Sequence, residues 1–327
     1  MNIPHTFEFD PTYGCDDAAL LAVRGPAGPD DFADFWRATF EEAMAPPLNL
    51  SVTPTRSPRE SVEVFHVEYD SLGGVRIGGW MTRPTGGGPL QRGVVVGHGY
   101  GGRDAPDLGL PGLDDAATIQ FCARGFNRSR HPDLPNVAAR HVTHGIEHRD
   151  TYIHRGCVAD AWRAASALLE CWPQVADELY YHGGSFGGGI GALALPWDAR
   201  FRKAFLRVPS FGHHPLRVTL PCTGSGHFVT RYWQQHPHVL ADTLAYHDAA
   251  TAARHITIPV LVCLARFDPA VPPPGQAAVY NALPGPRELV WRDADHYAAY
   301  PGEADDLARV HAAVARWFAA PNPSRAA

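Results

Sequence analysis

Three residues far apart in the sequence carry a hydroxyl, a carboxylate and an imidazole, which together can form an activated nucleophile. Ser185 stands in the motif Gly183-x-Ser185-x-Gly187, Asp268 follows it, and His296 comes last. An isolated serine hydroxyl reacts poorly near neutral pH, because a base must take its proton. The base in turn needs a carboxylate, which fixes its tautomer and stabilises the imidazolium. These residue types predict attack on a carbonyl group through a covalent acyl intermediate.

The residues around Ser185 indicate a sharp turn from a strand into a helix. A short apolar run at 179–181 leads into the motif, and a run of small residues from Gly191 follows it. In a nucleophile elbow the serine adopts a strained backbone conformation, and only glycine fits at the flanking positions Gly183 and Gly187. The motif alone is weak in so glycine-rich a chain, since Ser185 could also be an ordinary turn serine.

The acid and the base stand where an α/β-hydrolase fold would place them. That fold carries its catalytic residues in the chain order serine, acid, histidine, each on a loop after a strand. The apolar run 258–264 predicts a buried parallel strand, with Asp268 just beyond its carboxyl end. A shorter strand is predicted at 287–292, and His296 follows it ahead of a final helix at 304–318.

Each of these two assignments has an ordinary structural alternative. Asp268, in Phe-Asp-Pro, is also typical of a turn or a helix N-cap. His296 is one of 18 histidines and could simply lie on the surface. Asp293 and Asp295 compete for the role of the acid, but both are too near His296 in sequence to reach around its ring easily. The fold predicts the three positions jointly, which favours the catalytic interpretation.

A fourth element supplies donors for the charge that develops on the carbonyl oxygen. The core strand predicted at 92–97 runs into His98-Gly-Tyr-Gly-Gly102. In esterases of this fold, an N–H of this loop joins the N–H of the residue after the nucleophile in an oxyanion hole. The expected donors are the backbone N–H groups of Tyr100 and Phe186. Loss of one such donor typically lowers turnover by about 10²–10³.

The remaining pattern predicts an α/β fold, a mostly parallel central sheet with helices on both faces. We expect an N-terminal extension over 1–60 packing on the core, an α/β-hydrolase domain over 61–320 with cap-like insertions at about 103–150 and 207–250, and a tail at 321–327. Individual elements predicted are a capped helix at 30–43 with Phe32, Phe35, Trp36 and Phe40 on one face, a Pro-rich link at 46–58, an antiparallel hairpin of 61–69 with 75–81, a short strand at 126–129, and helices at 155–170 and about 228–235.

Composition limits the classes of partner. The 327 residues are 45% hydrophobic and 19% charged, with a formal net charge of −6. Such a balance argues against nucleic acid or an anionic membrane as the main partner. The chain shows neither a secretory signal nor a stretch of transmembrane length, and its six cysteines are scattered without paired spacing. We therefore expect a cytoplasmic protein with reduced thiols that acts on a small-molecule ester without a cofactor.

A group of histidines offers a different chemistry. His141, His144 and His148 would share one face if this segment were helical, as metal ligands can. Gly145 interrupts the segment, and no carboxylate or cysteine is placed to complete a defined site. A loop lining the pocket or exposed to solvent is the default expectation, with no metal.

Several passages together resemble the acetyl xylan esterases and cephalosporin C deacetylases. The likeness spans roughly residues 32–318, and the order and spacing agree as well as the motifs. This resemblance implies the α/β-hydrolase fold, the roles given above for Ser185, Asp268, His296 and the Tyr100 N–H, and association of subunits into a homo-oligomer. The matching passages are 32–40, His98–Gly102, 151–161, Gly183–Gly189, 230–237, 244–248, Asp268 with Pro272, and His296.

Three departures from that family flank the expected site. Phe186 stands where the family usually has Gln, and Tyr297 stands where a Glu usually follows the histidine. The family's Arg-Gly-Gln signature, expected after the strand near Phe126, is replaced by a segment beginning at Asn127. Since the donor after the nucleophile is a backbone N–H, the chemistry should survive while the polarity of the pocket changes.

The leading hypothesis is a serine esterase that removes a short acyl group, with acetyl as the expected one, from small oxygen esters such as acetylated sugars. One alternative is an α/β-hydrolase for amides or for esters of longer acyl chains. A second alternative is a protein of this fold that only binds a ligand, against which the full set of catalytic residues argues.

Overall fold

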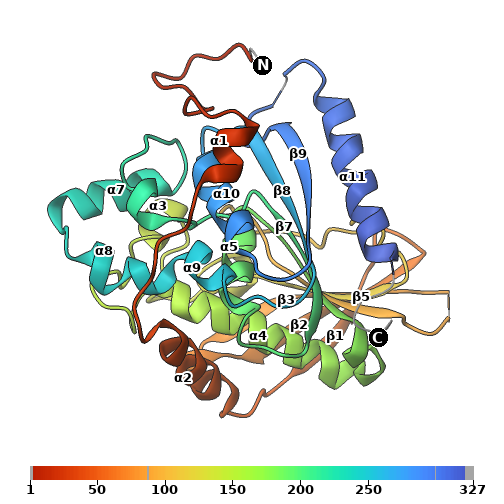
Figure 1. Ribbon diagram of the computed structural model, residues 1–327. Coiled ribbons are helices and arrows are strands. Elements are labelled where there is room, and N and C mark those ends of the chain that lie inside the picture. Colours follow the sequence, from red (N-terminus) through yellow and green to blue (C-terminus); the bar gives the residue numbers. More distant parts are fainter. Residues whose placement is uncertain (1–2, 87, 299, 321–327) are drawn as a thin grey trace.

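A central sheet of nine strands runs through the described part of the chain, which is residues 3–86, 88–298 and 300–320 of a computed structural model. The strand order is β1-β2-β3-β5-β4-β6-β7-β8-β9, antiparallel from β1 to β5 and parallel from there on (Figure 1). The tail expected at 321–327 lies outside the described residues. The strands are β1 (Ser51–Thr55), β2 (Val62–Asp70), β3 (Arg76–Pro84), β4 (Arg92–Val96), β5 (Ala116–Phe121), β6 (Leu179–Gly184), β7 (Phe201–Arg207), β8 (Val260–Phe267) and β9 (Arg287–Ala294).

Helices cover both faces of the sheet, which confirms the predicted α/β architecture. α4, α5, α9 and α10 pack on one face, and α11 lies on the other (Figure 1). No helix of the described residues is long and apolar enough to cross a membrane. The helices are α1 (Asp17–Ala22), α2 (Phe32–Met44), α3 (Ala138–His141), α4 (Ile153–Cys171), α5 (Phe186–Ala194), α6 (His214–Arg217), α7 (Gly226–Gln235), α8 (Val239–Asp242), α9 (Ala249–Ala253), α10 (Pro273–Ala282) and α11 (Glu303–Ala319).

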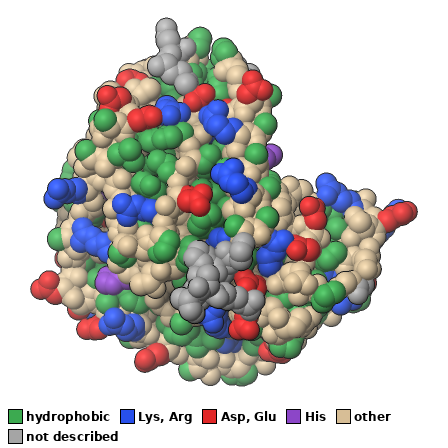
Figure 2. Space-filling view, turned by 45° about the vertical axis from the view of Figure 1, so that its right-hand side comes forward, with side chains coloured by type: hydrophobic (Ala, Val, Ile, Leu, Met, Phe, Trp, Pro, Cys, Tyr) green, Lys and Arg blue, Asp and Glu red, His purple; other side chains and the backbone are tan. Residues whose placement is uncertain are grey.

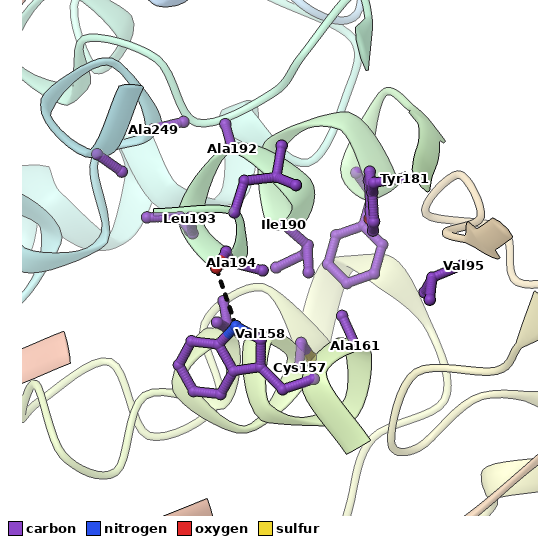
Figure 3. Packing of buried hydrophobic residues seen from close by; sticks show 14 of the residues in the cluster. Val95, Cys157, Val158, Ala161, Tyr181, Ile190, Ala192, Leu193, Ala194 and Ala249 are labelled. Carbon is purple, nitrogen blue, oxygen red and sulfur yellow. Dashed lines mark hydrogen bonds between the residues drawn. The ribbon is translucent and has the colours of Figure 1, made fainter. Parts of the chain in front are cut away.

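Helix α5, which begins directly after Ser185, is enclosed on all sides. Its nine residues are all buried, and Ile190 and Leu193 pack toward Val158 of α4 (Figure 3). The indole Nε1 of Trp162 donates a hydrogen bond of 2.9 Å to the carbonyl oxygen of Ala194 at the end of α5. This packing allows the strand, the turn and the helix that carry Ser185 to hold a fixed geometry.

The antiparallel part of the sheet was predicted only in part from the sequence. The hairpin of β2 and β3 is confirmed. The segment expected to be a Pro-rich link contains the edge strand β1, which tolerates Pro54 because an edge strand leaves one side of its backbone unpaired. On the face of the molecule that Figure 2 shows, acidic and basic side chains are interspersed.

The strand predicted at 126–129 is wrong. Residues 127–129 form a single 3₁₀ turn, and the strand of the sheet is β5, ten residues earlier. Its pattern was obscured by polar side chains that are buried in pairs: the hydroxyls of Thr82 and Thr118 lie 2.7 Å apart, and the Gln120 amide accepts a hydrogen bond from Arg103. The segment 103–150 therefore contributes a core strand, and its residues 103–115 cross the α11 face as an extended loop.

Helix α2 forms as predicted and buries Phe32, Phe35 and Trp36, but its predicted side-chain cap is absent. The Asp31 carboxylate, at the N-cap position, instead accepts hydrogen bonds from the Tyr246 hydroxyl and the Arg149 guanidinium. These long-range partners compete with the backbone N–H groups of the helix for the same oxygens.

Candidate active site

The structure brings the serine, the histidine and the acid into one hydrogen-bonded line. The Oγ of Ser185 lies 3.0 Å from Nε2 of His296, and Nδ1 of His296 lies 2.9 Å from Oδ2 of Asp268. Ser185 follows β6, Asp268 follows β8 and His296 follows β9, so all three lie at the carboxyl edge of the parallel strands. Because Asp268 can only accept, Nδ1 donates to it, and Nε2 of the neutral ring is left to accept the serine proton.

Ser185 adopts the strained backbone conformation that an elbow requires. Its φ is 54° and its ψ is −118°, a left-handed region that side-chain-bearing residues rarely occupy. The Ser185 N–H is fixed by the Arg207 carbonyl at 2.8 Å. A Cβ on Gly183 would lie 2.5 Å from the Gly187 oxygen, and one on Gly187 would lie 2.8 Å from backbone atoms of Gly97 and His98.

This crowding gives a prediction for stability. Gly187→Ala is expected to lower the free energy of unfolding by about 1–3 kcal/mol, because the added methyl group meets backbone that has no room to move. Urea denaturation followed by circular dichroism measures the change. Gly86→Ala is the control, since a Cβ there meets nothing within 4 Å. Equal stability of the two variants would contradict the packing described here.

The carboxylate of Asp268 is fully buried and held on both oxygens. Its Oδ1 accepts the backbone N–H groups of Ala270 and Val271, both at 2.9 Å. Its Oδ2 accepts the Gln276 side chain at 3.0 Å as well as His296. The Asp268 N–H donates to the carbonyl of Pro11 in the N-terminal segment. These donors compensate the burial of the charge and fix the direction in which the carboxylate faces the histidine.

Asp295 lies beside the same histidine but has other partners. Its Oδ1 accepts the backbone N–H of His296 at 2.8 Å and is 3.6 Å from Nδ1. Its Oδ2 pairs with Arg292 at 2.7 Å and with Arg207 at 3.5 Å. Asp295 therefore anchors the histidine loop, while Asp268 holds the shorter contact to the ring. Asp293, the other competitor for the acid role, pairs with Arg266 instead.

The two acids change the proton affinity of the histidine. Burial alone lowers the pKa of His296, but the hydrogen bond to Asp268 and the charges of Asp268 and Asp295 outweigh it, so the pKa lies above its ordinary value of 6.5. An imidazole with a raised pKa is a stronger base for the serine proton.

Two backbone donors near Ser185, one in the loop 98–102 and one at the first residue of α5, are open in the described structure. Within the described part of the chain, the N–H groups of Tyr100 and Phe186 donate no hydrogen bond. The loop is fixed by His98, whose carbonyl accepts the Gly187 N–H at 2.8 Å and whose Nε2 accepts the Ala123 N–H at 2.9 Å. Burial lowers the pKa of His98 to about 3, so the ring stays neutral and can accept that bond.

The Tyr100 side chain is tied to two buried histidines that sequence reasoning did not connect with it. Its hydroxyl lies 3.0 Å from Nδ1 of His141 and 3.1 Å from Nε2 of His154. His141 donates its Nε2–H to the Arg124 carbonyl, so its Nδ1 accepts the tyrosine proton, and the tyrosine accepts from His154. No local pattern signals such a network, because its members come from separate elements.

The histidine segment does not form the helix on which a shared metal face depended. α3 ends at His141, whose ring nitrogens both have partners, and His148 is exposed beside Asp150. In the described residues, the group with ligand atoms close together is Asp268, Asp295 and His296, within 4.8 Å of one another. The hydrogen bonds described above already engage these atoms.

Phe186 is not part of the pocket wall in the described structure. Its ring is buried and lies 4.3 Å from the Tyr100 ring, centroid to centroid, with Phe211 and Phe126 at 6.0 and 6.5 Å. The side chain that replaces the family's usual Gln therefore packs against the Tyr100 ring of the loop 98–102. Tyr297 likewise points elsewhere, donating its hydroxyl proton to the Pro4 carbonyl.

The line of polar groups opens into a cavity of about 650 Å³. Ser185, His296 and Tyr100 lie on its wall, which continues past Leu110 of the loop 103–115 to Val314 of α11. The cavity is large enough for a small sugar ester.

The fold and this site define the protein class as an α/β-hydrolase. Residues 24–311 match the acetyl xylan esterase (AXE1) family, and the chain belongs to that family. It is 22% identical to the acetyl esterase Axe7A of Xylanibacter ruminicola over 279 residues, which is 80% of this chain and 61% of that protein. The chain thus spans about three fifths of that relative's length.

Two solved structures share the fold closely. An acetyl xylan esterase from Paenibacillus sp. R4 has a TM-score of 0.78 at 23% identity, covering 91% of this chain and 99% of that one. Acetyl xylan esterase 1 from a Thermoanaerobacterium species has a TM-score of 0.79 at 19% identity, covering 94% of this chain and 99% of that one.

The true position of β5 also corrects one of the three departures. The segment after that strand reads Arg124-Gly125-Phe126, so the first two residues of the family signature are present and only its Gln is replaced. Arg124 is buried and pairs with Asp160 of α4 at 2.7 Å. The full Arg-Gly-Gln signature is therefore still not found, but the departure is narrower than expected, because its expected location rested on the misplaced strand.

Proposed function

We propose that this protein is a serine carboxylesterase that removes acetyl groups from small oxygen esters such as acetylated sugars. The observation that carries the proposal is the hydrogen-bonded line from Ser185 through His296 to Asp268, which opens into a cavity beside two free backbone donors. The names of the related proteins support acetyl esters as the substrate class.

The geometry supports a two-step reaction. Nε2 of His296 takes the Ser185 proton while Oγ attacks the ester carbonyl, and Asp268 stabilises the imidazolium that forms. The Tyr100 and Phe186 N–H groups stabilise the negative oxygen of the tetrahedral intermediate. The imidazolium then protonates the departing alcohol, which leaves acetyl on Ser185. Water, deprotonated by the same histidine, releases acetate and regenerates the serine.

Covalent labelling tests the nucleophile directly. Incubation with a fluorophosphonate probe should give one label per chain, and peptide mapping should locate it on Ser185. Preincubation with excess phenyl acetate should slow the labelling, since both compounds react at one serine. Labelling at another residue, or none in a folded and hydrolytically active protein, would refute the proposed mechanism.

An acyl-length series separates acetyl esters from the alternative of longer acyl chains. With p-nitrophenyl esters from acetate to octanoate, we expect kcat/KM to be highest for acetate or propionate and to fall with length. A steady rise toward octanoate would instead favour an esterase for long acyl chains.

The compartment and the assembly are further proposals. The six cysteines are free in the described structure, which fits the reducing cytoplasm. We also propose that copies of the chain associate, as the family resemblance implies; sedimentation of the purified protein would measure this.

A further inference from the structure

Arg217 is a buried cation on the wall of the cavity, and none of the described residues serves as its counterion. The residue is 6% exposed, and within the described part of the chain its guanidinium makes no ion pair and donates no hydrogen bond. Its Nη1 is fully buried without a partner. A buried charge without compensation is costly, so proteins rarely keep one without a use for it.

The neighbours of Arg217 satisfy the cation only in part. The guanidinium lies over the Phe211 ring, 5.3 Å from its centroid. An aromatic face attracts a cation, but it leaves the N–H groups in the guanidinium plane without acceptors. The backbone at Arg217 is nevertheless well fixed. Its N–H donates to the His213 carbonyl at 2.8 Å, and the N–H of His214, in the same short helix, donates to buried Asp248 at 2.5 Å.

A second positive feature lies beside this side chain in the same cavity. Gly224 and Ser225, at the start of α7, line the cavity, and the Ser225 side chain does not cap the helix. A Cβ on Gly226, the first residue of α7, would lie 3.2 Å from Nη2 of Arg217. The partial positive charge of a helix N-terminus and the guanidinium therefore meet, an arrangement that an anion between them would stabilise.

Each of the other arginines on the wall has at least one polar partner. Arg207 and Arg292 both pair with Asp295, and Arg103 donates to the Gln120 amide oxygen at 2.6 Å. The acid among the described wall residues is Asp107, which accepts the Gly109 N–H. The wall of the cavity thus carries more positive than negative charge, and Arg217 is the arginine whose N–H groups are open to a ligand.

We propose that the ester bound in this cavity carries a carboxylate, which Arg217 and the first turn of α7 hold while Ser185 attacks the ester. A single planar guanidinium matches a carboxylate in shape and charge. The inference rests on the proposed esterase function and specifies its substrate. A carboxylate in the alcohol half keeps acetyl as the group removed, whereas one in the acyl half makes the substrate a half-ester of a dicarboxylic acid in place of an acetyl ester.

Matched pairs of esters test the proposal and separate these two sources. One pair is p-nitrophenyl hydrogen succinate against p-nitrophenyl methyl succinate, with the charge in the acyl half. The other is 3-acetoxybenzoate against its methyl ester, with the charge in the alcohol half. In one of the pairs, kcat/KM should favour the anionic ester about 10- to 100-fold at low salt. Equal rates in both pairs would overturn the proposal.

Substitution of the arginine should remove this preference. In Arg217→Met the ratio of anionic to neutral kcat/KM should fall by about 10- to 100-fold, and Arg217→Lys should retain part of it. Arg231→Met, on the exposed side of α7, is the matched control and should keep the wild-type ratio. An unchanged ratio in Arg217→Met would overturn the role given to Arg217.

A measurement on the unmodified protein covers the case in which the Arg217 variants do not fold. Succinate should inhibit p-nitrophenyl acetate hydrolysis at a concentration about tenfold lower or more than neutral succinamide does. Equal inhibition would count against the carboxylate site. If the neutral esters are hydrolysed through Ser185 but no charge preference is seen, this inference fails while the proposed function stands.

Discussion

Ser185→Ala is expected to lower kcat for p-nitrophenyl acetate by at least about 10⁴-fold, toward the 10⁶-fold loss typical of a lost serine nucleophile. The alanine removes the atom that forms the acyl intermediate, and His296 then has no hydroxyl at 3.0 Å to activate. Fluorophosphonate labelling should disappear in the same variant. The measurement is initial rate at saturating substrate, with thermal unfolding to verify the fold.

The residual rate of that variant is informative in itself. The Tyr100 and Phe186 donors and the cavity remain, so some acceleration over the reaction in water should persist. Ser57→Ala, in a loop outside the cavity, should retain wild-type activity. A Ser185→Ala protein with more than about a tenth of wild-type activity would exclude Ser185 as the nucleophile, since such losses are orders of magnitude in known serine hydrolases.

The sequence predicts the hydrogen-bonded line of Ser185, His296 and Asp268 because each of its members is marked locally. Ser185 is marked by the flanking glycines, where an added Cβ would clash with neighbouring backbone. Asp268 and His296 each follow a strand of the parallel sheet, which places them at the same edge of that sheet. The chain order of an α/β-hydrolase then joins the three. The three side chains share an edge because the strands that precede them are parallel, and the apolar runs in the sequence locate those strands.

The parts that sequence reasoning missed depend on contacts between distant elements. β5 was placed too late because Thr118 and Gln120 interrupt its apolar pattern, and both are buried against polar partners from β3 and from the loop after β4. No local sequence pattern signals the link from Tyr100 to His141 and His154. The same holds for the position of Arg217 on the cavity wall. Burial of a polar residue is a property of the folded arrangement, so a single sequence does not display it.

Asp268→Asn tests which carboxylate orients the base, a choice that the sequence left between Asp268 and its competitors near the histidine. Asparagine keeps the size of the side chain but can donate a proton to Nδ1, which would leave Nε2 protonated and unable to accept from Ser185. We expect kcat near neutral pH to fall by about 10³–10⁴-fold. Asp295→Asn should cost stability, because Arg292 and Arg207 lose a buried partner, and should lower kcat far less.

The pH profile distinguishes the two acids by the size of the shift, because both charges raise the pKa of His296 but Asp268 also accepts the hydrogen bond from its ring. His296 must be neutral to act as a base, so wild-type kcat/KM should fall as pH decreases through a pKa above 6.5. In Asp268→Asn the bond and charge that raise this pKa are lost while burial, which lowers it, remains. The acidic limb of the residual activity should therefore move to lower pH. A limb that moves in Asp295→Asn but stays in place in Asp268→Asn would assign the orienting role to Asp295, whose contact to Nδ1 is 3.6 Å against 2.9 Å for Asp268.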